Sequence, residues 1–329
     1  MKQLHLNNQP PEIICVGMTL VDFLAKGVLS FPHPGTTGIV DSISMSTGGD
    51  AINQAITLAK LGHRVSLFGV VGDDQQGSYI FSECQKYGIQ TDGMFIDKEQ
   101  PTSTSVVLID ANGERSFLSS RDSLIRQQGP EHINLEWVRP GVKIVSIGSL
   151  FCSENLDLKA LPTLLKKAKS VGATTIADLV CDRNNGSLEE MRNAFRYLDI
   201  IVPSYDEAVY FTGKTDPLAA AAEFQRYGVG TVIVKLGSRG AIAVSRDNKE
   251  AIHIPIFPTH VVDTTGSGDN FMAGLISGLV QGDSLADSME LGAAVAALSV
   301  QAVGASAGVK DARQVTDFIE SQTQQTANP

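Results

Sequence analysis

Short apolar runs of β-prone residues alternate along the chain with segments in which apolar residues recur at helical spacing. We expect strands at 13–16, 65–71, 143–147, 174–177, 200–202 and 231–236. Runs of this length and composition are typical of strands buried on both faces of a parallel sheet. Helical spacing is found at 51–61 and 79–87, and each of these segments stops at a glycine. The alternation predicts an α/β fold in three layers, a doubly wound and mainly parallel sheet with helices on both faces.

Two segments interrupt this alternation. Residues 23–46 contain prolines and glycines among β-prone residues, and 104–120 predicts a hairpin that turns at Asn112-Gly113. We expect a small β-sheet lid, formed by segments of about 23–46 and 102–121, at the edge of the main sheet.

The C-terminal region predicts a helical end to a single domain. Apolar and small residues at 285–302 predict a helix that completes the core, and the Thr/Gln-rich tail after Glu320 is expected to fray. No internal repeat divides the chain, so residues 1–329 are predicted to form one α/β domain with the lid as an appendage.

Composition excludes several classes of partner. Hydrophobic residues make up 43% of the chain, which is enough for a large core, and the net charge is −10. A partner with a phosphate backbone or an anionic membrane surface needs clustered Lys and Arg, so we expect neither nucleic acid nor membrane. A phosphorylated ligand would have to be bound by the residues of one local site, because the protein as a whole is negatively charged.

Cysteines and histidines indicate no metal or disulfide framework. The four cysteines, Cys15, Cys84, Cys152 and Cys181, lie far apart and are expected to be reduced and buried. The six histidines are scattered without metal-ligand spacing. The first twelve residues are polar, and no run has the length of a membrane span, so we expect a cytoplasmic protein.

The most informative stretch is 261–271, which is followed by a helical pattern. Gly266 and Gly268 permit a tight turn, and the backbone N–H groups of 266–269 would point from a helix N-terminus towards an anion. Asp269 beside such a cradle has the position of a general base for an attacking hydroxyl, and Asp263, expected at a strand end, has that of a cation organiser. The alternative is a glycine turn in which Asp269 only caps the helix.

The complete string at 263–271, Asp-Thr-Thr-Gly-Ser-Gly-Asp-Asn-Phe, resembles the C-terminal motif of the ribokinase (PfkB) family of carbohydrate kinases. Four further segments are similar to the family's motifs, in the family's order: Gly-Gly-Asp-Ala-Ile-Asn at 48–53, Val-Gly-Asp-Asp at 71–74, Lys-Leu-Gly-Ser-Arg-Gly at 235–240, and residues 293–306. The resemblance therefore spans nearly the whole chain.

The resemblance implies a ribokinase-like fold that uses ATP and Mg²⁺ to phosphorylate a hydroxyl of a small sugar or sugar derivative. It assigns Asp269 as the base and Gly266, Ser267 and Gly268 as the anion hole. It implies a substrate site formed by Asp22, Gly48, Gly49, Asp50, Asn53, Arg121 and Asp178. A carboxylate and an amide suit vicinal hydroxyls, although Asn53 as a backbone partner and Asp22 as a cap at the end of the first strand remain alternatives.

The nucleotide side is also implied by the resemblance. ATP would be held by Ser204, Glu207, Lys235, Gly237, Ser238, Gly240 and Ala297. Glu207 is the residue implied to hold Mg²⁺ through water. Asp263, Thr265 and Gly304 form the implied potassium site.

The chain departs from the family's pattern in three motifs. Ser204 stands where many members have Asn, in Asn-x-x-Glu. Val180 stands at the Asn of Asp-x-Asn-x-Arg, and Arg183 is displaced by one residue from that motif's arginine. Asp50 stands where ribokinases often have Lys, which argues against ribose.

Some features of the sequence also fit other functions. Gly-Ala-Ser-Ala-Gly at 304–308 matches the hydrolase string Gly-x-Ser-x-Gly, but a helical pattern precedes it where a strand is needed. Gly213-Lys214-Thr215 is similar to the end of a P-loop, but 204–212 predicts a helix that Gly213 terminates. A nucleoside kinase of the same family and a sugar- or nucleotide-sensing protein without turnover remain as alternatives. The unpaired lid edge is compatible with a homodimer through the lid.

Overall fold

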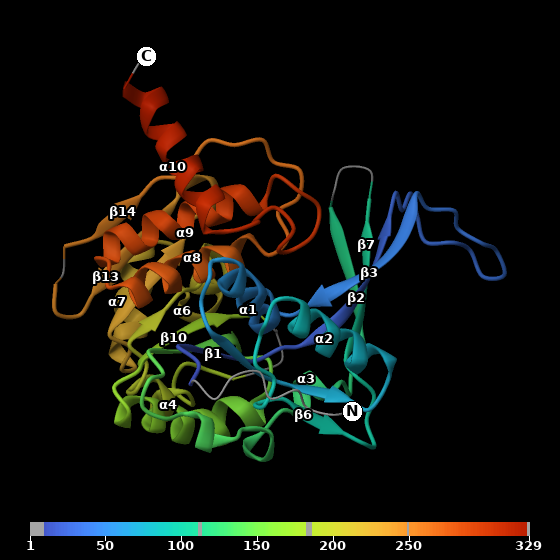
Figure 1. Cartoon of the computed structure of the whole chain (residues 1–329), viewed down its shortest axis with the longest axis horizontal. Helices are drawn as coiled ribbons and strands as arrows, with labels where there is room; N and C mark the ends of the chain where they lie inside the picture. The colour runs from blue at the N-terminus through green and yellow to red at the C-terminus, as the bar shows by residue number, and fades with distance from the viewer. Residues whose placement is uncertain (1–9, 111–113, 182–185, 249, 328–329) are drawn as a thin grey trace.

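The computed structural model describes residues 10–110, 114–181, 186–248 and 250–327 (Figure 1). Its main sheet has eight strands in the order β14-β13-β12-β11-β10-β9-β1-β4. Their bounds are β1 Ile13–Val16, β4 Val65–Phe68, β9 Ile144–Leu150, β10 Thr174–Leu179, β11 Ile200–Ile201, β12 Thr231–Lys235, β13 Ala241–Ser245 and β14 Ile252–Ile254. The six strands from β4 to β12 run parallel, β13 is antiparallel to them, and β14 pairs antiparallel with β13. The mainly parallel sheet is thus confirmed.

Helices cover both faces of this sheet. Their bounds are α1 Asp50–Lys60, α2 Gln75–Lys86, α3 Leu124–Gln127, α4 Leu161–Ser170, α5 Arg192–Phe195, α6 Tyr205–Thr212, α7 Pro217–Arg226, α8 Ser267–Gln281, α9 Leu285–Ser299 and α10 Ala312–Ala327. Short helical turns occupy η1 Pro130–His132, η2 Leu135–Trp137, η3 Asn155–Ala160 and η4 Gly237–Arg239.

The alternation of side chains along β1 shows why three layers form. Ile14 and Val16 pack into a core with residues of α4, α5, α6 and α7, whereas Ile13 and Cys15 pack into a second core with residues of α1, α2 and α8. Successive side chains of a strand point to opposite faces, so an entirely apolar strand needs a helical layer on each side.

A second, smaller sheet forms the lid. It has the order β3-β2-β7-β8, with β2 at Leu20–Lys26, β3 at Ser42–Gly48, β7 at Thr104–Ile109 and β8 at Arg115–Ser119. It projects from the main body with its long strands side by side (Figure 1). The predicted turn at Asn112-Gly113 lies outside the described residues.

Several expectations about individual elements were wrong. The run 65–71 is two strands, because β4 ends at Phe68 and β5, Val70–Gly72, pairs with β6, Phe95–Asp97. Strands β13 and β14 were not anticipated, and α2 begins at Gln75 rather than at 79. The tail after Glu320 does not fray, since α10 continues to Ala327.

The structure also bears on burial and on membrane association. Three of the cysteines are buried as expected, but Cys181 is exposed, because it follows β10 in a loop beyond the sheet. Across the described residues, no helix is both long and apolar enough to span a membrane. The organisation of 1–329 as one domain stays a prediction.

Candidate active site

A pocket of about 650 Å³ opens at the ends of the parallel strands. Asp178 lies in β10, Ser204 follows β11 and Lys235 ends β12, so the carboxyl ends of three neighbouring strands meet here. In open α/β sheets, ligands bind at this edge. Thirteen residues assigned to the site from the sequence line the pocket: Asp50, Asp178, Ser204, Glu207, Lys235, Gly237, Ser238, Gly240, Gly266, Ser267, Gly268, Asp269 and Ala297.

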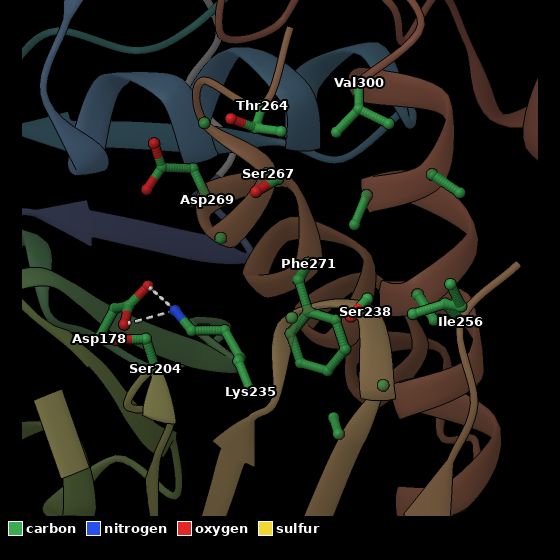
Figure 2. Close-up of a pocket in the computed structure, with 18 of the residues that line it drawn as sticks. Asp178, Ser204, Lys235, Ser238, Ile256, Thr264, Ser267, Asp269, Phe271 and Val300 are labelled. Carbon is green, nitrogen blue, oxygen red and sulfur yellow. Dashed lines mark hydrogen bonds and ion pairs between the residues drawn. The ribbon is translucent and has the colours of Figure 1, made fainter. Parts of the chain in front are cut away.

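Polar and apolar groups are separated within the pocket. The carboxylates and Lys235 lie on one side, and Phe271, Ile256 and Val300 lie on the other (Figure 2). A flat apolar ligand with an anionic tail would match this arrangement, because one end would find packing contacts and the other would find polar groups.

The turn before α8 depends on a glycine. Gly266 has φ 67°, and a Cβ at this position would lie 2.8 Å from the Cβ of Ala305. The side-chain amide of Asn270 donates to the carbonyls of Gly266 (2.7 Å) and Ala305 (2.5 Å). A left-handed residue here lets α8 begin at the wall of the pocket, which Gly266, Ser267 and Gly268 line, and a helix N-terminus in this position suits an anion. The backbone N–H of Ser267 donates to the carbonyl of Thr264 at 3.2 Å.

Asp269 is buried in the first turn of α8, with 7% of its surface exposed. Its Oδ2 accepts a hydrogen bond of 2.8 Å from Nδ2 of Asn53, which lies in α1. Burial raises the pKa of Asp269 to about 7; the bond from Asn53 and the charge of Lys235 lower it, while the charge of Asp178 raises it. A carboxylate with this pKa is a stronger base than an ordinary aspartate at neutral pH.

Lys235 and Asp178 form a buried ion pair beside Asp269. Lys235 Nζ lies 2.8 and 2.7 Å from the two carboxylate oxygens of Asp178 (Figure 2). Burial lowers the pKa of Lys235, but the carboxylates of Asp178 and Glu207 outweigh it and hold the pKa above its ordinary value. A Cβ at Gly268 would lie 3.1 Å from Lys235 Nζ, so the ammonium faces the glycine cradle closely.

Ser204 and Glu207 have a structural role that explains their spacing. Ser204 N–H donates to Glu207 Oε2 at 2.7 Å, and Glu207 N–H donates to Ser204 Oγ at 3.3 Å. This reciprocal pair is a capping box at the start of α6. Burial, followed by the charge of Asp178, raises the pKa of Glu207.

Several residues predicted to bind the acceptor lie where the lid strands meet α1. Asp22 lies within β2 rather than at the end of the first strand as predicted, and its carboxylate packs against Gly48, where a Cβ would lie 2.2 Å from Asp22 Oδ2. Burial raises the pKa of Asp22 to about 6. Asp50 accepts a hydrogen bond of 3.0 Å from Ser149 Oγ, and burial together with Asp269 raises its pKa. Gly49 has φ 102°, which favours glycine.

The model of the family "pfkB family carbohydrate kinase" matches residues 10–312. The chain belongs to the pfkB family. It is therefore a carbohydrate kinase. The chain is 28% identical to the ATP-dependent 6-phosphofructokinase of Thermoanaerobacterium thermosaccharolyticum, over 91% of each chain. It is 27% identical to the 5-dehydro-2-deoxygluconokinase of Photobacterium profundum, over 96% of this chain and 97% of the relative. The ribokinase of Arabidopsis thaliana in complex with ribose and ATP has a TM-score of 0.83 at 26% identity and covers 95% of this chain and 99% of its own.

Within this pfkB fold, not every predicted site residue joins the pocket. Asp263, Thr265 and Gly304 come together next to the lining residue Thr264 without lining the pocket themselves: Asp263 Oδ1 accepts from Thr265 N–H (2.8 Å), and Oδ2 accepts from Gly304 N–H (2.8 Å). Asp263 lies in a loop and not at a strand end, because β14 stops at Ile254. Arg121 is exposed after β8 and is not among the lining residues. Arg183 lies outside the described residues.

One residue with a charged contact to this region was missed. Arg115 of β8 forms an ion pair with Asp263. The sequence showed Arg115 only as part of a hairpin, and nothing in local pattern or spacing connects it with a loop far along the chain.

The two rival motifs are ruled out by their contexts. Ser306 lies in a loop that follows α9, so a helix and not a strand precedes it. Its carbonyl accepts a hydrogen bond of 2.6 Å from Lys60 Nζ. Gly213 ends α6 in the left-handed conformation, with φ 66°, where a P-loop would begin a helix.

Proposed function

We propose that this kinase transfers the γ-phosphoryl group of ATP to a hydroxyl of a small sugar or sugar derivative, with Asp269 as the general base. The observation that carries the proposal is a buried carboxylate with a pKa of about 7 at the N-terminus of α8, directly beside the glycine turn at 266–268 that lines the pocket. Base and anion cradle thus sit within one helical turn.

The reaction assigns a role to each group. Asp269 accepts the proton of the acceptor hydroxyl as its oxygen bonds to the γ-phosphorus, and the bond between that phosphorus and the β,γ-bridging oxygen breaks to release ADP. The backbone N–H groups of 266–268 stabilise the charge on the transferring group. Asn53 holds the carboxylate of Asp269 in place through its amide. Lys235, next to Gly268, adds positive charge at the cradle.

Magnesium fits the carboxylates that line the pocket. The described part of the chain has no cluster of three or more His, Cys, Asp and Glu side chains able to hold a metal. Mg²⁺ in kinases is bound by one or two carboxylates together with phosphate oxygens and water, so Glu207, which lines the pocket, would hold it through water. When bound, the ion neutralises charge on the phosphates.

Potassium at Asp263, Thr265 and Gly304 fits less well. Asp263 Oδ1 already accepts from Thr265 N–H and Oγ1, Oδ2 accepts from Gly304 N–H, and Arg115 supplies a positive charge. The carboxylate is satisfied by groups of the protein.

Similarity to known kinases supports the proposal. The ribokinase of Arabidopsis thaliana carries ribose and ATP in its solved complex, and both curated relatives named above are kinases of sugar-related compounds. Their different substrates leave the acceptor of this chain to experiment. Because ATP is the donor, we place the reaction in the cytoplasm.

The test is ADP release with Mg²⁺ across a panel of pentoses, hexoses, sugar acids, sugar phosphates and nucleosides, for the wild type and Asp269→Asn. We expect turnover on one class and a loss of about 10²- to 10⁴-fold in kcat in the variant, with ATP affinity nearly unchanged. Equal losses in ATP binding and turnover would refute the role of Asp269. Binding of ATP without turnover on any compound would favour a sensing protein.

We also propose that two copies pair through the outer face of the lid. Phe23, Met45, Val106 and Leu118 lie in register across the four strands, on the face opposite Asp22. Leu118 is 50% exposed, and Ile43 on the same face is 72% exposed. An apolar stripe of this kind marks an interaction surface. Sedimentation of Ile43→Asp beside the wild type tests the pairing, and a monomeric wild type would exclude it.

A further inference from the structure

An ion pair joins the lid sheet to the loop that precedes α8. Arg115 opens β8, opposite Ile109 of β7, and its Nη2 donates to Oδ1 of Asp263. The side chains of Arg115 and Asp263 are 17% and 6% exposed. A guanidinium and a carboxylate so well shielded from water interact strongly, because little solvent screens them.

Asp263 in turn organises the turn that forms the phosphate cradle. Its Oδ1 accepts from both Thr265 N–H and Thr265 Oγ1, at 2.8 and 2.7 Å, and its Oδ2 accepts from Gly304 N–H at 2.8 Å. Thr265 immediately precedes Gly266, the left-handed residue from which α8 starts. The position of the Asp263 carboxylate therefore fixes the direction of the first N–H groups of α8.

The charge of Arg115 also reaches the acceptor side. Burial raises the pKa of Asp22, and the guanidinium of Arg115 is the next largest influence, which lowers it. Asp22 belongs to β2, in the same lid sheet, and its carboxylate packs against Gly48. One guanidinium thus acts on a carboxylate on the acceptor side and on the carboxylate that shapes the cradle.

We propose that Arg115 is a positioning residue that latches the lid to the phosphate cradle, so that lid closure and ordering of the Thr265-Gly266 turn happen together. The inference rests on the proposed kinase function. With the latch closed, the cradle is complete only when the lid covers the pocket, and water is kept from the phosphoryl group. With the latch open, Asp263 loses its cationic partner, and the turn before α8 loses one of its supports.

Hydrogen exchange and ADP release together test the latch, in Arg115→Ala, Arg115→Lys and the control Arg226→Ala. Arg226 pairs with Glu223 on the surface of α7, its side chain is 75% exposed, and it is not among the residues that line the pocket. In Arg115→Ala with ATP and Mg²⁺, we expect faster amide exchange in both β8 and 263–268. The rate of acceptor phosphorylation should fall about 10- to 100-fold, because the reacting groups are displaced from their productive positions. The ratio of ATP hydrolysis without acceptor to acceptor phosphorylation should rise. Arg115→Lys should restore part of the protection and the coupling, and Arg226→Ala should match the wild type.

A double-variant cycle gives the outcome that identifies the pair. If Arg115 acts through Asp263, the combination of Arg115→Ala with Asp263→Asn will be no worse than the more impaired single variant. Additive losses, or unchanged exchange at 263–268 in Arg115→Ala and Arg115→Lys, would overturn the latch. Because exchange is measured without any acceptor, the latch can fail while phosphorylation persists, and it can hold even if no panel compound is phosphorylated.

Discussion

Asp269→Asn should make the folded protein more stable while it removes the base. The pKa of Asp269 rises from an ordinary 3.8 to about 7 in the folded state, chiefly because the carboxylate is buried. At about 1.4 kcal/mol for each unit of pKa, ionised Asp269 destabilises the fold by about 4 kcal/mol at neutral pH. Asparagine has the same shape, carries no charge and can still accept the hydrogen bond from Asn53.

The sign of the pH dependence follows from proton binding. Between the unfolded pKa near 3.8 and the folded pKa of about 7, the folded state holds a proton that the unfolded state has lost. The contribution of Asp269 to stability therefore falls as pH rises through this window. The advantage of Asp269→Asn over the wild type should grow by about 2–3 kcal/mol between pH 5 and pH 8.

Urea unfolding of both proteins at pH 5, 6, 7 and 8 measures this difference directly. Asp74→Asn is the matched control of opposite sign: hydrogen bonds from Thr102 and Gly77 outweigh burial and lower the pKa of Asp74, the N-cap of α2. That variant should be less stable than the wild type by nearly the same amount from pH 5 to pH 8, because the contribution of Asp74 is lost only as the pH falls below the ordinary pKa of 3.8. If the advantage of Asp269→Asn is the same at pH 5 and at pH 8, the assignment of a raised pKa to Asp269 is wrong.

Three further predictions follow from the same geometry. Acceptor kcat/KM should fall about tenfold for each pH unit below pH 7 and level off above it, because protonated Asp269 is no base; a flat ADP-release profile from pH 5.5 to 8 would exclude this. Lys235→Met should cost about 3–5 kcal/mol in urea unfolding at pH 7, because it leaves the buried carboxylate of Asp178 unpaired; a loss below 1 kcal/mol would show that the pair is exposed to solvent. Replacing potassium with sodium should change turnover by less than about twofold, since Arg115 already neutralises Asp263; a large potassium activation would contradict this.

The layered fold could be inferred from the sequence because its information is local. An entirely apolar run such as Ile13–Val16 can only be buried on both faces, and the glycines that follow the helical segments mark where those helices end. The glycine turn and Asp269 could also be predicted from the sequence, since Gly266 and Asp269 lie close together in the chain and occupy one helical turn. Strands β13 and β14 escaped because they are short and only partly buried at one end of the sheet, so they carry a weaker apolar signal.

The pKa values and ion pairs of the site depend on contacts between segments that lie far apart in the sequence. The sequence supplied Asp269, but its pKa depends on burial under α1 and on the amide of Asn53, 216 residues away. It supplied Asp178 and Lys235 as separate motifs, and only the order of the sheet, in which β11 alone separates their strands, brings them within 2.8 Å. Arg115 carried no local signal at all, because its role comes from where the lid lies over Asp263. Sequence thus determined which residues fold together locally, whereas tertiary structure set their charge, their partners and their exposure to water, since these depend on atoms far along the chain.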